Sequence, residues 1–166
     1  MAELTPSEKL QPCLLDRLTD DEPLVQVESR NQRVISQARY RAGVLRDLQW
    51  LFNTSAHLPI EGSRPFRIQN YPEAERSVIN FGTRQLCGLT VPHMRELEQH
   101  LANAIQVFEP RILSRTVTVH ADQERNIITF ELDGELWGNE RPEYLHVKTE
   151  VDLETGQCLL GDAPHG

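Results

Sequence analysis

The spacing of apolar residues predicts two long helices. Over residues 31–53 apolar side chains recur every three or four positions, which places them on one face of a helix. The members of this stripe are Val34, Ala38, Ala42, Val44, Leu45, Leu48, Leu51 and Phe52. A second stripe, over residues 91–108, comprises Met94, Leu97, Leu101, Ala104, Ile105 and Phe108. Gly43 lies inside the first helix, and because glycine weakens a helix by about 1 kcal/mol relative to alanine, we expect close packing there.

After residue 111 the period of the pattern changes from that of a helix to that of a strand. Apolar and polar residues alternate over 116–121, around 128–132 and over 145–153. Alternate strand residues point to opposite faces, so this period of two predicts an antiparallel sheet with one face in water. Turns are expected at 123–126 and 133–142. The predicted fold class is α+β: two main helices packed on a small antiparallel sheet, a three-stranded meander in the C-terminal part.

Shorter segments complete the predicted organisation. We expect a flexible tail over 1–12, a single domain over 13–160 and a flexible C-terminus over 161–166. Residues 14–18 form a short amphipathic turn whose three leucines fit docking on its own domain or on a partner. Residues 54–90 are irregular because proline and glycine interrupt them. Within this segment we expect a short helix over 73–80, followed by a turn with a buried aromatic ring at Asn80-Phe81-Gly82.

Composition narrows the classes of function. The 166 residues carry 17 basic and 25 acidic side chains, a net charge of −8, which argues against nucleic-acid binding. No stretch approaches the roughly 20 apolar residues of a membrane span, so membrane insertion is not expected. The charge is also segregated. Residues 30–67 hold seven bases and two acids, between an acidic N-terminal segment and an acidic C-terminal one, as in a protein with separate faces for different partners.

The sequence lacks the motifs of most catalytic and metal-binding sites. Cys13, Cys87 and Cys158 are far apart and odd in number, so we expect free thiols in the reducing cytoplasm, with Cys87 in the core. The six histidines show no metal-ligand spacing, and phosphate-binding loops and nucleophile motifs are absent. We therefore expect no metal, no cofactor and no catalytic residues. Paired carboxylates of a glycosidase are the one serious enzymatic option, with Glu73, Glu75 and Glu109 as candidates.

The sequence Glu109-Pro110-Arg111 forms a rigid corner after the second helix. Proline fixes the backbone between the two charged residues. The helix dipole favours arginine at a helix C-terminus and disfavours glutamate, so Glu109 is expected to have an assigned ion-pair partner. From the residues alone, a local brace and a contact with another protein are equally good interpretations.

Taken in order, several short motifs resemble the TssE family, baseplate subunits of the bacterial type VI secretion system. They are residues 14–18, 46–53, 71–73, 77–82, the corner 108–111, and 151–156, so that the resemblance spans residues 13–156. TssE is similar to the wedge protein of contractile phage tail baseplates, sometimes called a lysozyme-like family. The resemblance implies a structural, non-enzymatic role in which Glu109-Pro110-Arg111 serves baseplate assembly and the start of sheath polymerisation.

The same resemblance implies partners and a location. We expect contacts with the wedge subunits TssF and TssG and with the sheath proteins TssB and TssC, in a cytoplasmic baseplate docked at the inner membrane complex. Sheath proteins of this kind interlock by strand addition, so the open edge of the sheet over 112–153 is the first template to consider. The alternative is a peptidoglycan-cleaving enzyme, as the lysozyme-like label suggests.

Overall fold

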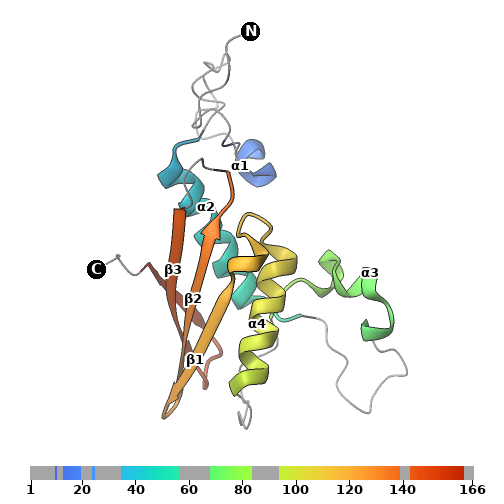
Figure 1. Cartoon of the computed structure of the whole chain (residues 1–166), viewed down its shortest axis with the longest axis vertical. Coiled ribbons are helices and arrows are strands. Elements are labelled where there is room, and N and C mark those ends of the chain that lie inside the picture. The colour runs from blue at the N-terminus through green and yellow to red at the C-terminus, as the bar shows by residue number, and fades with distance from the viewer. Residues whose placement is uncertain are drawn as a thin grey trace.

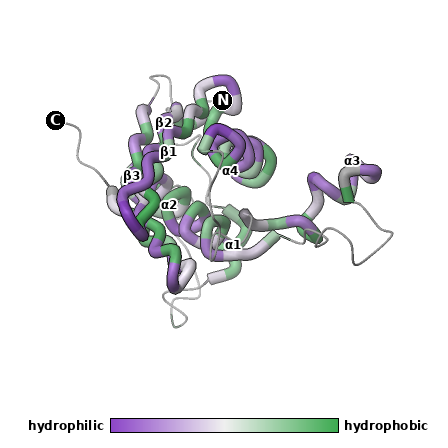
Figure 2. Tube along the Cα trace, turned by 90° about the horizontal axis from the view of Figure 1, so that it is seen from below, coloured by the Kyte–Doolittle hydropathy of each residue, from purple (hydrophilic) through white to green (hydrophobic). Residues whose placement is uncertain are grey.

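A four-stranded antiparallel sheet carries both long helices on one face (Figures 1 and 2). The computed structural model describes residues 10, 13–19, 24, 35–56, 68–83, 94–138 and 143–162. The helices are α2 (Gln37–Asn53), which packs on the β4 side of the sheet, and α4 (Met94–Phe108), which packs on β1. The predicted α+β class is confirmed.

The strands follow one another across the sheet in chain order. They are β1 (Thr118–Glu124), β2 (Ile127–Leu136), β3 (Glu143–Asp152) and β4 (Cys158–Asp162). The predicted three-stranded meander is therefore wrong by one strand. β4 escaped prediction because Cys158, Leu159 and Leu160 give no alternation, although Leu159 is exposed and its neighbours face inward. β4 ends at Asp162, so its last two residues lie in the segment 161–166 that was expected to be a flexible C-terminus. The bounds of the domain stay a prediction.

Two of the turns are shorter than expected. β1 extends through Glu124 and β2 starts at Ile127, which leaves a two-residue loop in which Arg125 has a φ of 54°. β2 continues to Leu136, through the region predicted as a turn, because residues 133–136 keep their pairing with β3. The start of the first strand is also later than expected, since Ser114–Thr116 form a 3₁₀ turn, η5.

The ends of the long helices follow their capping groups. The Ser36 hydroxyl accepts a hydrogen bond from the Arg39 N–H at 3.2 Å, so α2 begins at Gln37 rather than at residue 31. Residues 31–34 lie outside the described part of the chain, as do residues 91–93 at the expected start of α4. No helix among the described residues is long and apolar enough to cross a membrane.

The core lies between the two helices and the inner face of the sheet. On α4 the predicted stripe is confirmed, with Leu97, Leu101 and Ile105 buried. On α2 the predicted Val44, Leu48, Leu51 and Phe52 are buried, but Ala38 and Ala42 are exposed and Tyr40, which was not predicted, is buried in their place. The larger side chains bury more apolar area, so they decide which face turns inward. The sheet contributes Val119, Ile128, Phe130, Leu132, Leu145, Val147 and Val151.

The segment between the helices makes short elements rather than one helix. The helix expected over 73–80 is divided into α3 (Pro72–Glu75) and a 3₁₀ turn, η4 (Val78–Asn80), preceded by the 3₁₀ turn η3 (Ile68–Asn70). The division falls at Ser77, whose hydroxyl accepts from the Ile79 N–H and so starts a new turn. α3 stands away from the rest of the domain in both views (Figures 1 and 2).

Gly82 and Gly43 differ in whether their position could accept a side chain. Gly82 has a φ of 126°, and a Cβ placed there would lie 2.3 Å from the Thr54 carbonyl oxygen. Gly43 is buried in α2, yet a Cβ there would meet Asp16 and Arg111 at 3.5 and 3.6 Å, which is ordinary van der Waals contact. The packing expected at Gly43 is therefore close but leaves space for a methyl group.

We expect Gly43→Ala to raise the free energy of unfolding by about 1 kcal/mol, because alanine favours the helix interior. Gly82→Ala is the matched comparison and should lower it by more than about 2 kcal/mol, since both the backbone angle and the Thr54 carbonyl oppose a side chain. Urea unfolding of the two variants measures both effects. Equal destabilisation by the two substitutions would contradict this assignment.

Candidate functional site

The predicted corner is braced by an ion pair between its own two charged residues. Glu109 continues from α4, with its N–H still donating to the Ile105 carbonyl at 2.8 Å. Beyond Pro110 the chain turns back, and Arg111 donates from Nε to Glu109 Oε1 at 2.6 Å and from Nη2 to Oε2 at 2.5 Å. Glu109 is only 3% exposed. Glu109 therefore has its expected partner inside the domain, which corresponds to the interpretation as a local brace.

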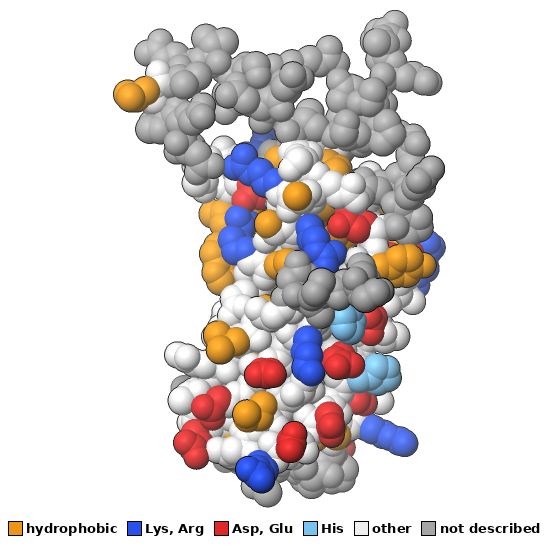
Figure 3. Space-filling view, turned by 90° about the vertical axis from the view of Figure 1, so that its left-hand side faces the viewer, with side chains coloured by type: hydrophobic (Ala, Val, Ile, Leu, Met, Phe, Trp, Pro, Cys, Tyr) orange, Lys and Arg blue, Asp and Glu red, His pale blue; other side chains and the backbone are white. Residues whose placement is uncertain are grey.

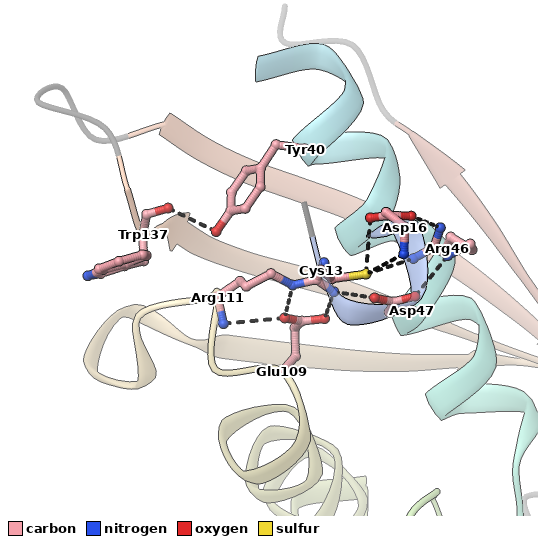
Figure 4. A network of polar contacts seen from close by, with 8 residues as sticks. All are labelled: Cys13, Asp16, Tyr40, Arg46, Asp47, Glu109, Arg111 and Trp137. Atoms are coloured by element: carbon pink, nitrogen blue, oxygen red, sulfur yellow. Dashed lines mark hydrogen bonds and ion pairs between the residues drawn. The ribbon is translucent and has the colours of Figure 1, made fainter. Parts of the chain in front are cut away.

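The brace extends to α2 through Asp47 (Figure 4). Arg111 Nη2 donates to Asp47 Oδ2 at 2.5 Å, and Arg46 Nε donates to Asp47 Oδ1 at 2.9 Å. One carboxylate thus joins two arginines and ties the corner to the middle of the first long helix. Sequence reasoning did not single out Asp47, although it is one of only two acids among residues 30–67.

The short helix α1 (Leu14–Leu18) is held on the same network by polar groups. Arg46 Nη1 donates to Asp16 Oδ1 at 2.5 Å, and the Cys13 thiol donates to Asp16 Oδ2 at 3.0 Å. The leucines of this helix do not anchor it: Leu14 and Leu18 are 71% and 74% exposed. Of the two interpretations of residues 14–18, apolar docking on their own domain is therefore not observed, and docking on a partner stays a prediction.

Backbone hydrogen bonds fix the corner against the end of the sheet. The Leu113 N–H donates to the Glu135 carbonyl at 2.8 Å, and the Trp137 N–H donates to the Arg111 carbonyl at 2.7 Å. Trp137 in turn accepts a hydrogen bond at its carbonyl from the Tyr40 hydroxyl, at 3.0 Å. Burial raises the pKa of Tyr40, so this hydroxyl keeps its proton. The corner is thus attached to β2 and to α2 independently of its charges.

The second predicted motif, Asn80-Phe81-Gly82, meets the corner through an aromatic pair. The Phe81 and Phe108 rings are edge to face, with centroids 5.4 Å apart, and Phe108 directly precedes Glu109. The backbone after the motif is fastened to the end of α2, since Thr83 exchanges hydrogen bonds with Thr54 and Ala56. The structure therefore brings together two motifs that lie almost 30 residues apart in sequence.

An open groove of about 800 Å³ lies at this corner. Most of its lining is apolar, and the charged side chains of Asp47, Glu109 and Arg111 lie among it. Trp50 and Trp137 line the groove and are 48% and 62% exposed, while Leu15 of α1 is 40% exposed. Exposed tryptophans around a concave apolar surface are typical of a site that binds another molecule.

Hydrogen bonds shift the pKa values of Arg111, Arg46 and Asp16 in the directions that favour their charged forms. Burial lowers the pKa of Arg111, but hydrogen bonds to Glu109 and Asp47 outweigh burial and hold it above its ordinary value. Hydrogen bonds to Asp47 and Asp16 raise the pKa of Arg46. Burial raises the pKa of Asp16, but hydrogen bonds from Arg46 and Cys13 outweigh this effect and place it below its ordinary value.

The carboxylates considered for catalysis lie in different environments. Glu73 and Glu75 are exposed on α3, whereas both oxygens of Glu109 are bound by Arg111. Among the described residues no group of His, Cys, Asp and Glu is arranged to hold a metal ion. His120 and His146 lie on β1 and β3 with β2 between them. Burial raises the pKa of the Cys158 thiol to about 12, and Cys87 lies outside the described residues.

An α+β domain with a braced corner beside an open apolar groove presents a surface suited to binding another protein. Residues 38–141 match the family of baseplate wedge protein gp25, and the chain belongs to this family. The match includes Asp47, the Asn80-Phe81-Gly82 motif and the corner; α1, β3 and β4 lie outside it. Comparison with curated proteins gave no match.

Family membership confirms the resemblance drawn from the sequence. It gives the chain a structural role in a baseplate, in contact with other baseplate components. The structural character of the family also favours a protein without enzymatic activity.

We expect Arg111→Ala to lower the free energy of unfolding by about 3–5 kcal/mol, because Glu109 would remain buried without a partner. Adding Glu109→Leu should recover a large part of this loss, since the uncompensated charge is then removed. Urea unfolding of the single and double variants measures both changes. Arg115→Ala, at an exposed arginine, is the control and should change stability by less than about 0.5 kcal/mol. A fully stable Arg111→Ala variant would contradict the structural role of the brace.

The attachment of α1 should depend on pH. The pKa of Asp16 is lowered in the folded protein, so its stabilising contribution is present above its ordinary value of 3.8 and is lost as the pH falls further. Backbone NMR signals of residues 14–18 should therefore shift toward random-coil positions below about pH 4, while those of α2 persist. Asp16→Asn should remove this pH dependence. Unchanged signals of α1 down to pH 2 in the wild-type chain would contradict this expectation.

Proposed function

We propose that this chain is a TssE-type subunit of a type VI secretion baseplate, which joins the wedge complex and helps to start polymerisation of the contractile sheath. The observation that carries the proposal is the braced corner Glu109-Pro110-Arg111 beside an open apolar groove, in a chain of the baseplate wedge family. The ordered motifs shared with TssE support the type VI assignment.

The role that the proposal gives to the corner is to shape a binding surface. Arg111 is 18% exposed and already has two carboxylate partners, so most of its charge is used inside the domain. The rigid turn instead places Pro110 in the lining of the groove, to which the two exposed tryptophans also contribute. A preorganised apolar surface binds with a smaller loss of conformational entropy, which suits a subunit placed among several others.

In this proposal the chain binds the wedge subunits TssF and TssG at the groove and also contacts the sheath proteins TssB and TssC. The proposed location of the chain is the cytoplasmic baseplate docked at the inner membrane complex. Its role is structural, and Glu109 serves as the anchor of Arg111 rather than as an acid catalyst.

Trp137 gives the sharpest test, because its side chain is exposed and only its backbone holds the corner. We expect Trp137→Ser to leave the thermal midpoint within a few degrees of the wild type and to weaken co-purification with TssF and TssG at least tenfold, as for loss of an interface tryptophan. Fluorescent sheath should then fail to assemble in cells that carry this variant as the sole copy.

Ile127→Ser is the matched control, since Ile127 is 46% exposed on the sheet and away from the groove. It should leave TssF–TssG binding and sheath assembly unchanged. Normal binding by Trp137→Ser would refute the groove as the wedge contact. Substitution of Arg111 is less suited to this test, because loss of stability and loss of binding would coincide.

A further inference from the structure

The segment between the long helices forms an arm that projects from the domain. This arm, residues 68–83, contains η3, α3 and η4, and α3 stands apart from the sheet and from both long helices (Figures 1 and 2). Its base is fixed to the end of α2, because the Thr83 N–H donates to the Thr54 carbonyl at 2.9 Å and the Thr83 carbonyl accepts from the Ala56 N–H at 2.8 Å. The arm is therefore attached to the domain at a defined place.

Apolar side chains are exposed on the arm. Val78 is 86% exposed, and more than half of the surface of Tyr71 and Ile79 is exposed as well. The outer face of the sheet differs, since acidic side chains gather over it (Figure 3). Charged groups are well solvated at a free surface, whereas several exposed apolar side chains on one projecting segment indicate a surface that another protein covers.

Between the arm and α4 lies an open cleft of about 740 Å³. Its apolar lining includes Leu101 and Phe108 of α4, and its polar lining includes Asn80 of the arm and His100 and Asn103 of α4. Phe108 also lines the groove at the corner, so the cleft and the groove are neighbouring concave surfaces. The exposed apolar side chains of the arm lie outside the cleft, so a partner that enters the cleft can cover the arm from two sides.

One hydrogen-bond acceptor of this cleft residue Asn80 has no donor. Asn80 Nδ2 donates to the Glu75 carbonyl at 3.0 Å. Because a carbonyl can only accept, this bond also fixes which end of the amide is the oxygen. Asn80 Oδ1 is buried, and no donor among the described residues reaches it. A buried acceptor without a hydrogen bond is unfavourable, so this oxygen points to a donor that another molecule supplies.

The charges around the cleft indicate what kind of donor fits. Glu75 and Arg76 of α3 line it with opposite charges, so the lining has little net charge. An ammonium or guanidinium group would lose hydration there without gaining a carboxylate of its own. A main-chain N–H beside an apolar side chain fits better. The side-chain amide of Asn103 carries both a donor and an acceptor, which suits contact with a main chain.

We propose that this cleft receives a loop of a neighbouring baseplate subunit. An apolar side chain of the loop packs against Leu101 and Phe108, and a main-chain N–H donates to Asn80 Oδ1. This oxygen is shielded from water in the free chain, so the arm shifts slightly when the donor pairs with it. Family membership supplies the class of partner, a baseplate component. The choice of TssF and TssG as the source of the loop rests on the proposed function.

Val107→Arg tests the cleft by filling it. Val107 lines the cleft and is exposed on α4, so the fold should be retained. We expect at least tenfold weaker binding of the purified TssF–TssG complex at an unchanged thermal midpoint, because the longer side chain takes the space of the loop. Gln99→Arg is the matched control, since Gln99 is exposed on the same helix, outside the lining, and the substitution adds the same charge. It should bind like the wild type.

Asn80→Leu separates binding from folding. Leucine is similar in size and lacks the acceptor, so it removes the unpaired oxygen together with one exposed hydrogen bond to Glu75. We expect a thermal midpoint within a few degrees of the wild type and at least tenfold weaker binding of TssF–TssG. A lower midpoint with unchanged binding would assign Asn80 to the fold alone and contradict the proposal.

Short overlapping peptides of TssF and TssG identify the loop. At least one of them should shift the backbone NMR signals of residues 75–82 and 100–107 in the wild-type chain. The same peptide should leave the signals of Val107→Arg in place.

Wild-type affinity of both Val107→Arg and Asn80→Leu for TssF–TssG overturns the assignment of the cleft and leaves the proposed function standing. Dimers of the chain alone that Val107→Arg abolishes would assign the cleft to a second copy, which overturns it as well. A wild-type chain that does not bind TssF–TssG overturns the proposed function, and with it the assignment of the loop to a wedge subunit.

Discussion

The ion pair between Glu109 and Arg111 is the interaction on which the rest of the site depends. A carboxylate that is 3% exposed needs compensation, and Arg111 supplies it with two hydrogen bonds in a geometry that Pro110 makes rigid. Through Asp47 the same guanidinium fixes the end of α4 to the middle of α2. The two helices have few direct contacts with each other elsewhere, so this bridge and the sheet beneath them set their relative position.

The groove can remain open because charged groups hold the elements around it, while the apolar side chains there stay at the surface. Polar contacts hold α1 and the corner in place, so apolar side chains there are not needed for the core. Leu14, Leu18 and Trp137 consequently remain largely exposed, and they are available to a partner. In an isolated domain such exposure promotes aggregation, whereas in a subunit surrounded by others it becomes interface.

Polar side chains also cover backbone groups at the two edges of the sheet, and they differ in kind between β4 and β1. Glutamine and asparagine on α2 provide donors and acceptors together, while glutamate on α4 and aspartate on β1 provide acceptors alone.

The sequence by itself determined the two long helices, the alternating strands, the α+β class and the importance of the corner, because periodicity and a proline between two charges act locally. It did not reveal β4, whose residues do not alternate and whose edge is held by Gln49 and Asn53 more than 100 residues away. Nor did it show that Ala38 and Ala42 lie outside the core. Only the tertiary structure decided that Glu109 is buried with Arg111 as its partner. It also decided that Asp47, Asp16 and the groove lie at this corner, because packing brings together elements that are distant in sequence.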